Sequence, residues 1–295
     1  MDARLLIIGG AAGPALLVRF VELAGVQSAR IVVIATASEA PESAEAFYAR
    51  TFISLGAGSV RALRLSTRAE ANAPGVADVL RDATGVFFTG GDQERITTVL
   101  GGTATDSLLQ ELVADGSVVL GGTSAGAAMM SATMIVGGDG PGVTAASVRT
   151  GPGLEFLPGV LIDQHFAQRG RLNRLLSAVA LYPHELGLGI DEDTAILTHG
   201  DCFEVLGTGA VTVVDAGGAT DIRVPASGPI ALAGARIHVL PAGHTFHLTG
   251  RRPGIGDNSN EDREPAPPAR PQRVPVPAGG GGPAPAGRAG RPGDL

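Results

Sequence analysis

The chain has 295 residues, of which 44% are hydrophobic and 17% charged, enough to bury a core in one large domain or two small ones. Tryptophan is absent and aromatic residues are few, and a core of Ala, Val, Leu and Ile is typical of a parallel sheet covered by helices. The formal net charge of −7 argues against non-specific nucleic-acid binding, which requires a basic surface. The single cysteine, Cys202, excludes an internal disulfide and a cysteine-based zinc site.

The first apolar run, Leu5 to Ile8, is too short for the core of a signal peptide or for a membrane span. No later stretch reaches membrane-spanning length without a glycine or a charged residue. We therefore expect a cytoplasmic protein that has no membrane partner.

Short apolar runs then alternate with amphipathic stretches along the chain. Five strands are predicted at 4–10, 29–38, 59–65, 85–92 and 117–126, with helices between them at 14–25, 43–56, 74–82 and 93–102. Further strands are predicted at 159–166 and 186–193. This alternation predicts right-handed βαβ units, and hence an α/β fold with an open, mainly parallel sheet and helices on both faces.

The pattern changes in the last third of the chain. From about Thr194 it indicates short antiparallel strands joined by glycine turns, which we expect to finish or flank the main sheet. Residues 251–295 contain mostly Pro, Gly, Arg and Ala, and such a segment cannot bury enough apolar surface to offset its ordering entropy. We therefore predict a catalytic domain over residues 1–250 and a disordered tail over 251–295.

Polar segments follow several of the predicted strands, where an open parallel sheet binds its ligands. They are TGGDQ at 89–93, GTSAG at 122–126, DQHF at 163–166 and GIDEDTA at 189–195. Their position favours an active site at this edge of the sheet.

Ser124 lies between glycines in GTSAG, after a buried strand and before a predicted helix over 127–136. This is the context of a G-x-S-x-G elbow, in which a nucleophilic serine sits on a sharp turn. A small-residue bend with no catalytic role is the alternative interpretation of the same pentapeptide.

A nucleophilic serine requires a base, and the base requires a carboxylate that orients it. Of the six histidines, His165 stands out because it ends a predicted strand and precedes QRGRLNRLL. In GIDEDTA, the alternation of side chains along an extended segment places either Glu192 alone, or Asp191 together with Asp193, toward the site. The histidine is alternatively structural, and the acidic run is alternatively an ordinary turn.

Two more segments carry groups that bind ligands. Gln93 follows the paired glycines of TGGDQ, whose N–H groups suit an oxyanion or a carboxylate, and the absence of a GK[ST] sequence argues against a phosphate loop. A helix beginning near Arg169 would place Arg171 and Arg174 on one face. Such arginines suit carboxylate recognition, or they form a solvated basic face.

Taken in order, FFTGGDQERIT, GGTSAGAAMMS, GLEFLPGVLIDQHFAQRGRLNRLL and LGLGIDEDTA resemble the cyanophycinase family of serine peptidases, which also contains aspartyl dipeptidase. The resemblance implies a fold like that of the class I glutamine amidotransferases. It implies a triad of Ser124, His165 and Glu192, and an oxyanion hole formed by the N–H groups of Ala125 and Gly91. The motif positions associated with the substrate pocket are Gln93, Asp163, Gln164, Arg169, Arg171 and Arg174.

The resemblance also implies an activity. The expected substrate is cyanophycin, a polyaspartate whose side chains carry arginine, and the expected product is the β-Asp-Arg dipeptide. The expected enzyme is a homodimer that requires neither a metal nor another cofactor. The alternatives are a peptidase acting on short aspartyl peptides and a catalytically silent binding protein on the same scaffold.

Overall fold

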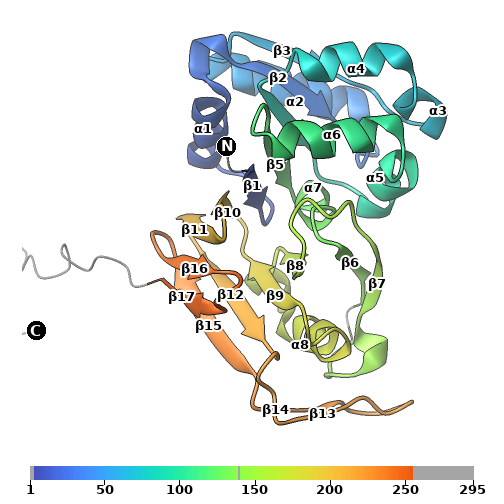
Figure 1. Ribbon diagram of the computed structural model, residues 1–295, viewed down its shortest axis with the longest axis vertical. Helices are drawn as coiled ribbons and strands as arrows, with labels where there is room; N and C mark the ends of the chain where they lie inside the picture. The colour runs from blue at the N-terminus through green and yellow to red at the C-terminus, as the bar shows by residue number, and fades with distance from the viewer. Residues whose placement is uncertain (1–2, 139, 255–295) are drawn as a thin grey trace, which may run out of the picture. The chain divides into compact units, whose positions relative to one another are not determined.

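A nine-stranded mixed sheet forms the centre of the computed structural model, which describes residues 3–138 and 140–254 (Figure 1). Its strand order is β17-β16-β11-β10-β1-β5-β4-β2-β3. The parallel half consists of β1 (Arg4–Ile8), β5 (Val119–Thr123), β4 (Gly85–Phe88), β2 (Arg30–Ile34) and β3 (Ser59–Ala62). The antiparallel half consists of β10 (Thr194–His199), β11 (Cys202–Gly207), β16 (Thr245–His247) and β17 (Arg252–Pro253).

Helices cover both faces of this sheet, as expected. Successive strand residues point to opposite faces, so Leu6 and Ile8 of β1 pack with one set of helices, whereas Leu5 and Ile7 pack with another. The first set is α1 (Pro14–Ala24) and α2 (Pro41–Ser54). The second set is α4 (Pro74–Arg81), α5 (Gln93–Leu100) and α6 (Ala104–Ala114), and the one-turn α3 (Arg68–Ala71) precedes it.

A second, four-stranded sheet has the order β15-β12-β9-β8. It contains β8 (Val160–Gln164), β9 (Leu186–Ile190), β12 (Ala210–Asp215) and β15 (Arg236–Pro241). Helix α8 (Leu172–Leu181) packs on it through a separate apolar cluster that includes Leu161, Leu175 and Val214. The C-terminal strands thus divide between the two sheets, and β8 and β9 pair in parallel with each other rather than with the main sheet.

The sequence-based element assignment of residues 89–152 needs two corrections. The helix predicted over 127–136 is only α7 (Ala125–Ala128), and the chain then forms β6 (Thr133–Gly137), which pairs with β7 (Arg149–Pro152). The β-branched residues of that stretch favour a strand once a partner strand is available. Helix α6 was not predicted, and it lies with α5 in the connection from β4 to β5.

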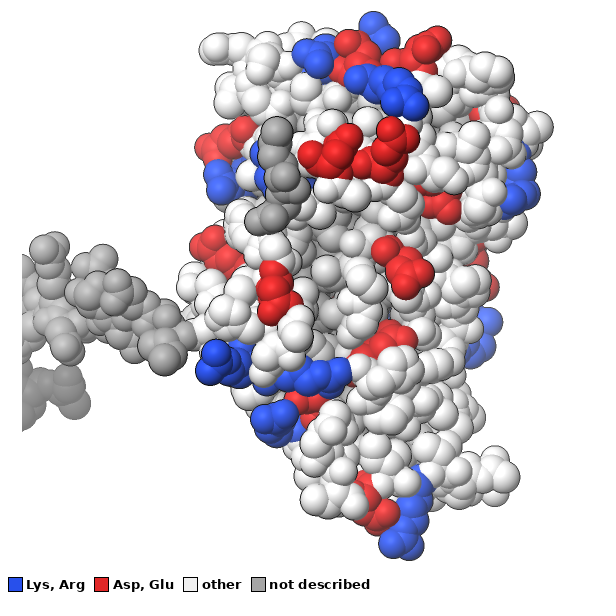
Figure 2. Space-filling model, viewed as in Figure 1, with Lys and Arg blue, Asp and Glu red and all other residues white. Residues whose placement is uncertain are grey.

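The remaining described elements are short. They are a hairpin of β13 (Asp221–Arg223) and β14 (Ala231–Ala233), and the 3₁₀ turns η1 (Val26–Ser28), η2 (Ala145–Ser147) and η3 (Ala167–Arg169). Among the residues that the structure describes, no helix is long and apolar enough to cross a membrane. On the face shown in Figure 2, acidic and arginine side chains lie in small mixed groups. Most of the predicted tail, from residue 255 onward, lies outside the described residues.

Candidate active site

Ser124 stands on a sharp turn between β5 and α7. Its backbone angles, φ 54° and ψ −108°, lie in a region that residues with a side chain rarely adopt. The flanking glycines are required by close contacts. A Cβ on Gly122 would lie 2.3 Å from the carbonyl oxygen of Gly126, and a Cβ on Gly126 would lie 2.5 Å from that of Phe88. The turn therefore has the tight geometry that a G-x-S-x-G elbow needs.

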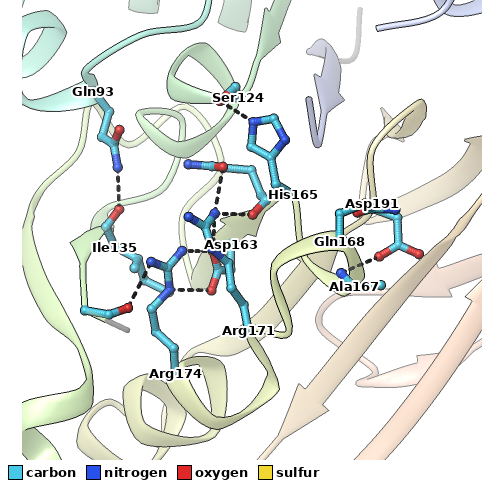
Figure 3. A network of polar contacts seen from close by, with 12 residues as sticks. Gln93, Ser124, Ile135, Asp163, His165, Ala167, Gln168, Arg171, Arg174 and Asp191 are labelled. Carbon is cyan, nitrogen blue, oxygen red and sulfur yellow. Dashed lines mark hydrogen bonds and ion pairs between the residues drawn. The ribbon is translucent and has the colours of Figure 1, made fainter. Parts of the chain in front are cut away.

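His165 lies beside the serine, although it comes from the second sheet. The distance between Ser124 Oγ and His165 Nε2 is 2.9 Å (Figure 3). His165 directly follows β8 with a φ of 49°, and its backbone N–H donates to the carbonyl of Gly9, just past β1, at 2.7 Å. The ends of strands from the two sheets are thus joined at the histidine.

Glu192 extends this contact into a chain of three side chains. Its Oε1 lies 2.6 Å from His165 Nδ1. A carboxylate only accepts hydrogen bonds, so Nδ1 carries the proton toward Glu192, and Nε2 is left to accept from the Ser124 hydroxyl. This is the arrangement in which a histidine acts as the base for a serine.

The two aspartates beside Glu192 accept backbone N–H groups instead. The carboxylate of Asp191 accepts the N–H groups of Ala167 and Ala210, at 3.0 and 3.1 Å. The carboxylate of Asp193 accepts the N–H of Gly13 at 2.9 Å. The alternation of side chains therefore turns Glu192 alone toward the histidine, which was one of the two possibilities left open by the sequence.

The environment of His165 keeps its imidazole neutral. Burial lowers the pKa of His165 below its ordinary value of 6.5, the hydrogen bond to Glu192 raises the pKa, and the positive charge of Arg169 lowers it again. The net effect is a lowered pKa. A neutral imidazole at neutral pH is able to accept a proton at once.

The two N–H groups predicted as an oxyanion hole lie at the ends of neighbouring parallel strands, β5 and β4. Ala125 is the first residue of α7, so its N–H has no partner within the helix. Gly91 follows β4, and a Cβ on the preceding residue, Gly90, would lie 3.4 Å from the Cβ of Ser124. Within the described ranges, neither N–H is hydrogen-bonded to another group.

Asp163 and Gln164, the last residues of β8, bind two buried arginines (Figure 3). Arg174 Nε donates to Asp163 Oδ2 at 2.9 Å, and its Nη2 donates to Asp163 Oδ1. Arg171 Nη1 donates to Gln164 Oε1 at 2.9 Å and to the Gln164 carbonyl, and it lies 3.6 Å from Asp163 Oδ1. Because these donors hold the strand end next to His165, the network has the geometry of a support for the histidine.

The structure corrects the expectation of a helix that begins near Arg169. Residues Ala167–Arg169 form a 3₁₀ turn, and α8 begins only at Leu172. The side chains of Arg171 and Arg174 are 9% and 6% exposed, so they do not form a solvated basic face.

The two remaining residues of the predicted substrate pocket lie apart from this network. Gln93 begins α5, and its Nε2 donates to the carbonyl of Ile135 at 2.9 Å. Arg169 is exposed at the end of η3, and its charge acts on His165. Of the three arginines predicted for the substrate pocket, Arg169 is thus the one that is exposed to solvent.

The chain also matches known proteins in sequence. The model of peptidase family S51 matches residues 5–206. The chain belongs to peptidase family S51. A cyanophycinase of Trichormus variabilis is 40% identical over 256 residues, which cover 83% of this chain and 86% of that protein. A cyanophycinase of Geminocystis herdmanii is 37% identical over 265 residues, which cover 87% of this chain and 97% of that protein. These relatives identify this S51 chain as a serine peptidase.

A solved structure shares the fold of this S51 peptidase. It is a peptidase from an acI-B1 actinobacterium, with a TM-score of 0.64 and 22% sequence identity, and the match covers 84% of this chain and 97% of that one. A likeness at this identity shows the fold, and it agrees with the α/β architecture predicted from the strand and helix pattern.

The sequence did not single out two groups at this S51 site. The side chain of Gln168 accepts the backbone N–H of Glu192 at 3.0 Å, so it helps to fix the residue that orients His165. Gly9 accepts the N–H of His165. The sequence placed both residues near recognised motifs, since Gln168 is three residues beyond the histidine and Gly9 directly follows β1, but a motif does not show which group a residue binds. Within the described ranges, no group of three or more His, Cys, Asp and Glu side chains is placed to hold a metal ion.

Proposed function

We propose that this S51 peptidase degrades cyanophycin to β-Asp-Arg dipeptides through an acyl-enzyme on Ser124. The observation that carries the proposal is the hydrogen-bonded chain from Ser124 through His165 to Glu192, with distances of 2.9 and 2.6 Å. Such a chain activates a serine hydroxyl without a metal.

The first half of the reaction forms the acyl-enzyme. Ser124 Oγ attacks an aspartyl main-chain carbonyl of the substrate while His165 Nε2 accepts the hydroxyl proton. Glu192 stabilises the resulting imidazolium and keeps the ring in the correct tautomer. The N–H groups of Ala125 and Gly91 bind the negative oxygen of the tetrahedral intermediate.

The second half releases the products. His165 gives its proton to the departing amine, the C–N bond breaks, and the carbonyl carbon remains bound to Ser124 as an ester. A water molecule, deprotonated by His165, then attacks this ester, and the Ser124 oxygen leaves with the proton. The histidine returns to its neutral state at the end of each cycle.

The choice of substrate rests on the relatives and on charge. The curated relatives over most of the chain are named cyanophycinases. Each repeat of cyanophycin carries a guanidinium and a carboxylate, so its pocket must present both signs of charge. Arg169 supplies an exposed cation, and the residue before it, Gln168, binds the backbone of Glu192.

Incubation of the purified protein with insoluble cyanophycin tests the proposal, with Ser124→Ala alongside. We expect the suspension to clear and mass spectrometry to detect β-Asp-Arg with the wild type, and neither with the variant. Cleavage of short aspartyl peptides without any action on the polymer would favour the dipeptidase alternative. Binding of the polymer without any cleavage would favour a silent binding protein.

We also propose that the enzyme is a cytoplasmic homodimer, as the resemblance to its family implies. Sedimentation of the purified chain tests the dimer, and a monomer at micromolar concentration would contradict it. Fractionation of the producing cells tests the location.

A further inference from the structure

A cavity of about 540 Å³ lies between the chain segments that follow β2, β3 and β4. The segment after β2 contributes Ser38 and Glu39, the segment after β3 contributes Arg64, and the start of α5 contributes Glu94 and Arg95. All three strands belong to the parallel half of the main sheet, so the cavity opens at the same edge as Ser124. Its size is within the range of ordinary ligand pockets.

The walls of this cavity, which we call the β2–β4 pocket, are held by hydrogen bonds. Arg95 Nη1 donates to the carbonyl of Ser38 at 3.2 Å and so connects two of its sides. The Asp92 N–H donates to the Ala37 carbonyl at 2.9 Å and connects the same two segments. Thr36 Oγ1 donates to the Leu65 carbonyl at 2.7 Å on the third side. The pocket is therefore formed by the folded chain without a ligand.

The charged groups that line the β2–β4 pocket differ in how far they are exposed to solvent. Arg64 binds the buried Glu45 through two nitrogens, at 2.6 and 3.3 Å, and this pair forms one wall. The carboxylates of Glu39, Asp92 and Glu94 lie on exposed residues. Four carboxylates against two guanidinium groups leave the lining net negative, which attracts a cation. Carboxylates are also the groups that pair with a guanidinium through charge-assisted hydrogen bonds.

The pocket is within reach of a chain bound at Ser124. Gly90 lies against Ser124, and Asp92, only two residues later, already lines the pocket. The sheet order β5-β4-β2-β3 puts the pocket one to three strands away from the serine, which is roughly 5–15 Å. An extended polyaspartate main chain covers that span with about two to four residues.

We propose that the β2–β4 pocket binds the arginyl side chain of a cyanophycin repeat that lies a few residues from the scissile bond. This inference rests on the proposed function, because it takes the same polymer as ligand. The carboxylates of Glu39 and Glu94 bind the guanidinium, and Arg95 lies beside the carboxylate that the same arginine carries. The pocket thereby makes binding depend on substrate length.

Kinetics on soluble β-Asp-Arg oligomers test this site. The pocket variant is Glu39→Gln with Glu94→Gln, which removes two charges and keeps the side-chain size. The matched control is Glu22→Gln with Glu111→Gln, because both glutamates are exposed and lie outside the pocket lining. The substrates are an oligomer of two repeats, which is too short to reach the pocket, and one of eight repeats.

We expect the pocket variant to raise the KM of the long oligomer relative to that of the short one by roughly three- to tenfold, the effect of losing one or two partly exposed ion pairs. The control should keep the wild-type ratio. An unchanged ratio in the pocket variant, with thermal unfolding like that of the wild type, would overturn the proposed site.

A binding measurement separates this inference from the proposed function. Calorimetry with the long oligomer is carried out on Ser124→Ala, with and without the pocket substitutions. If the pocket substitutions weaken the Kd of Ser124→Ala for the long oligomer by roughly three- to tenfold, the site is supported. If the two proteins have the same Kd, the site is overturned. Failure of the wild type to cleave either oligomer would overturn the proposed function, and the calorimetry would still decide the pocket.

Discussion

Three residues around the proposed catalytic centre are held in backbone conformations that favour glycine. Ser124, His165 and Asp193 have φ values of 54°, 49° and 47°. Such conformations cost free energy and persist only where the surroundings fix them. The first two present their own side chains to the site, whereas Asp193 lies in the acidic loop whose Glu192 contacts His165.

The protonation of His165 predicts the pH dependence of the reaction. In the proposed mechanism the neutral imidazole is the base, so kcat/KM should rise with pH, and because the pKa of His165 is lowered, the midpoint should lie below 6.5. Glu192→Gln removes the carboxylate, whose hydrogen bond and negative charge both raise the pKa of His165, so the midpoint should move lower still. We expect kcat to fall on the order of 10³-fold or more, since the amide does not hold the tautomer. A midpoint that moves upward in the variant would contradict this role.

Gly10 tests how closely the histidine ring is held. A Cβ at this position would lie 2.3 Å from His165 Cε1, and its φ is 128°. We expect Gly10→Ala to displace the ring and to lower kcat by about 10²-fold, because a shift of about 1 Å at a reacting group has this effect.

Gly75→Ala is the matched control for Gly10→Ala. Gly75 lies in α4, and nothing lies within 4 Å of its added Cβ. This variant should keep full activity and gain about 0.4–1 kcal/mol in the free energy of unfolding. Equal activity in the two variants would show that the ring is not confined by Gly10.

At the scale of elements, the connection between β8 and α8 decides where His165 stands. Asp163 on the strand binds Arg174 on the helix, and Gln164 binds Arg171, which precedes the helix. A strand that ends in charged groups is stable inside a fold only if each charge is paired. The pairs therefore fix both the packing of α8 and the end of β8.

Asp163→Asn should weaken this connection strongly. Removing one partner of a buried ion pair typically costs about 3–5 kcal/mol in the free energy of unfolding, to be measured by chemical denaturation. Asp221→Asn, which affects an exposed pair with Arg223, should cost less than about 1 kcal/mol. If Asp163 positions the histidine, kcat falls and KM changes little. A raised KM with an intact kcat would instead indicate direct contact with substrate.

At the scale of the whole molecule, an ion pair ties the two sheets together. Asp215 ends β12 in the second sheet, and its side chain is fully buried. Its Oδ1 lies 2.6 Å from Arg251 Nη1, in the turn between β16 and β17 of the main sheet, and its Oδ2 lies 2.8 Å from Arg236 Nη2. Burial acts to raise the pKa of Asp215, but the hydrogen bonds from the Gly217 N–H and Arg251 outweigh it, and the pKa is lowered.

This lowered pKa predicts how stability depends on pH. The contribution of Asp215 is complete above its ordinary pKa of 3.8 and is lost as the pH falls through the lower folded value. Asp215→Asn should therefore lower the free energy of unfolding at neutral pH by about 2 kcal/mol, less than for a fully buried pair because Arg236 is half exposed. Thermal unfolding should show a Tm difference of roughly 4–8 °C at neutral pH that shrinks on acidification. A difference that stays constant down to strongly acidic pH would rule out the charge as its cause.

The sequence by itself determined the features that depend on neighbouring residues. Alternating apolar runs and amphipathic stretches predicted the parallel half of the main sheet and the helices α1, α2, α4 and α5, because side-chain periodicity is local. The glycines around Ser124 predicted its turn for the same reason. The family motif named Glu192 as the residue that accompanies His165, whereas the residues alone left two possibilities open.

Only the tertiary structure decided which distant segments pair. The residues of β8 and β9 are compatible with either sheet, and in the structure Leu161 of β8 and Gly187 of β9 pack against α8 in the second one. The stretch after Ser124 has the sequence pattern of a helix, but residues 133–137 pair with β7, the next strand along the chain, and form a hairpin instead. The sequence left open whether Arg171 and Arg174 form a solvated face. In the structure they are buried and bind Gln164 and Asp163. In each case the deciding free energy comes from a contact with another element of the fold, which the local pattern of apolar and polar residues does not encode.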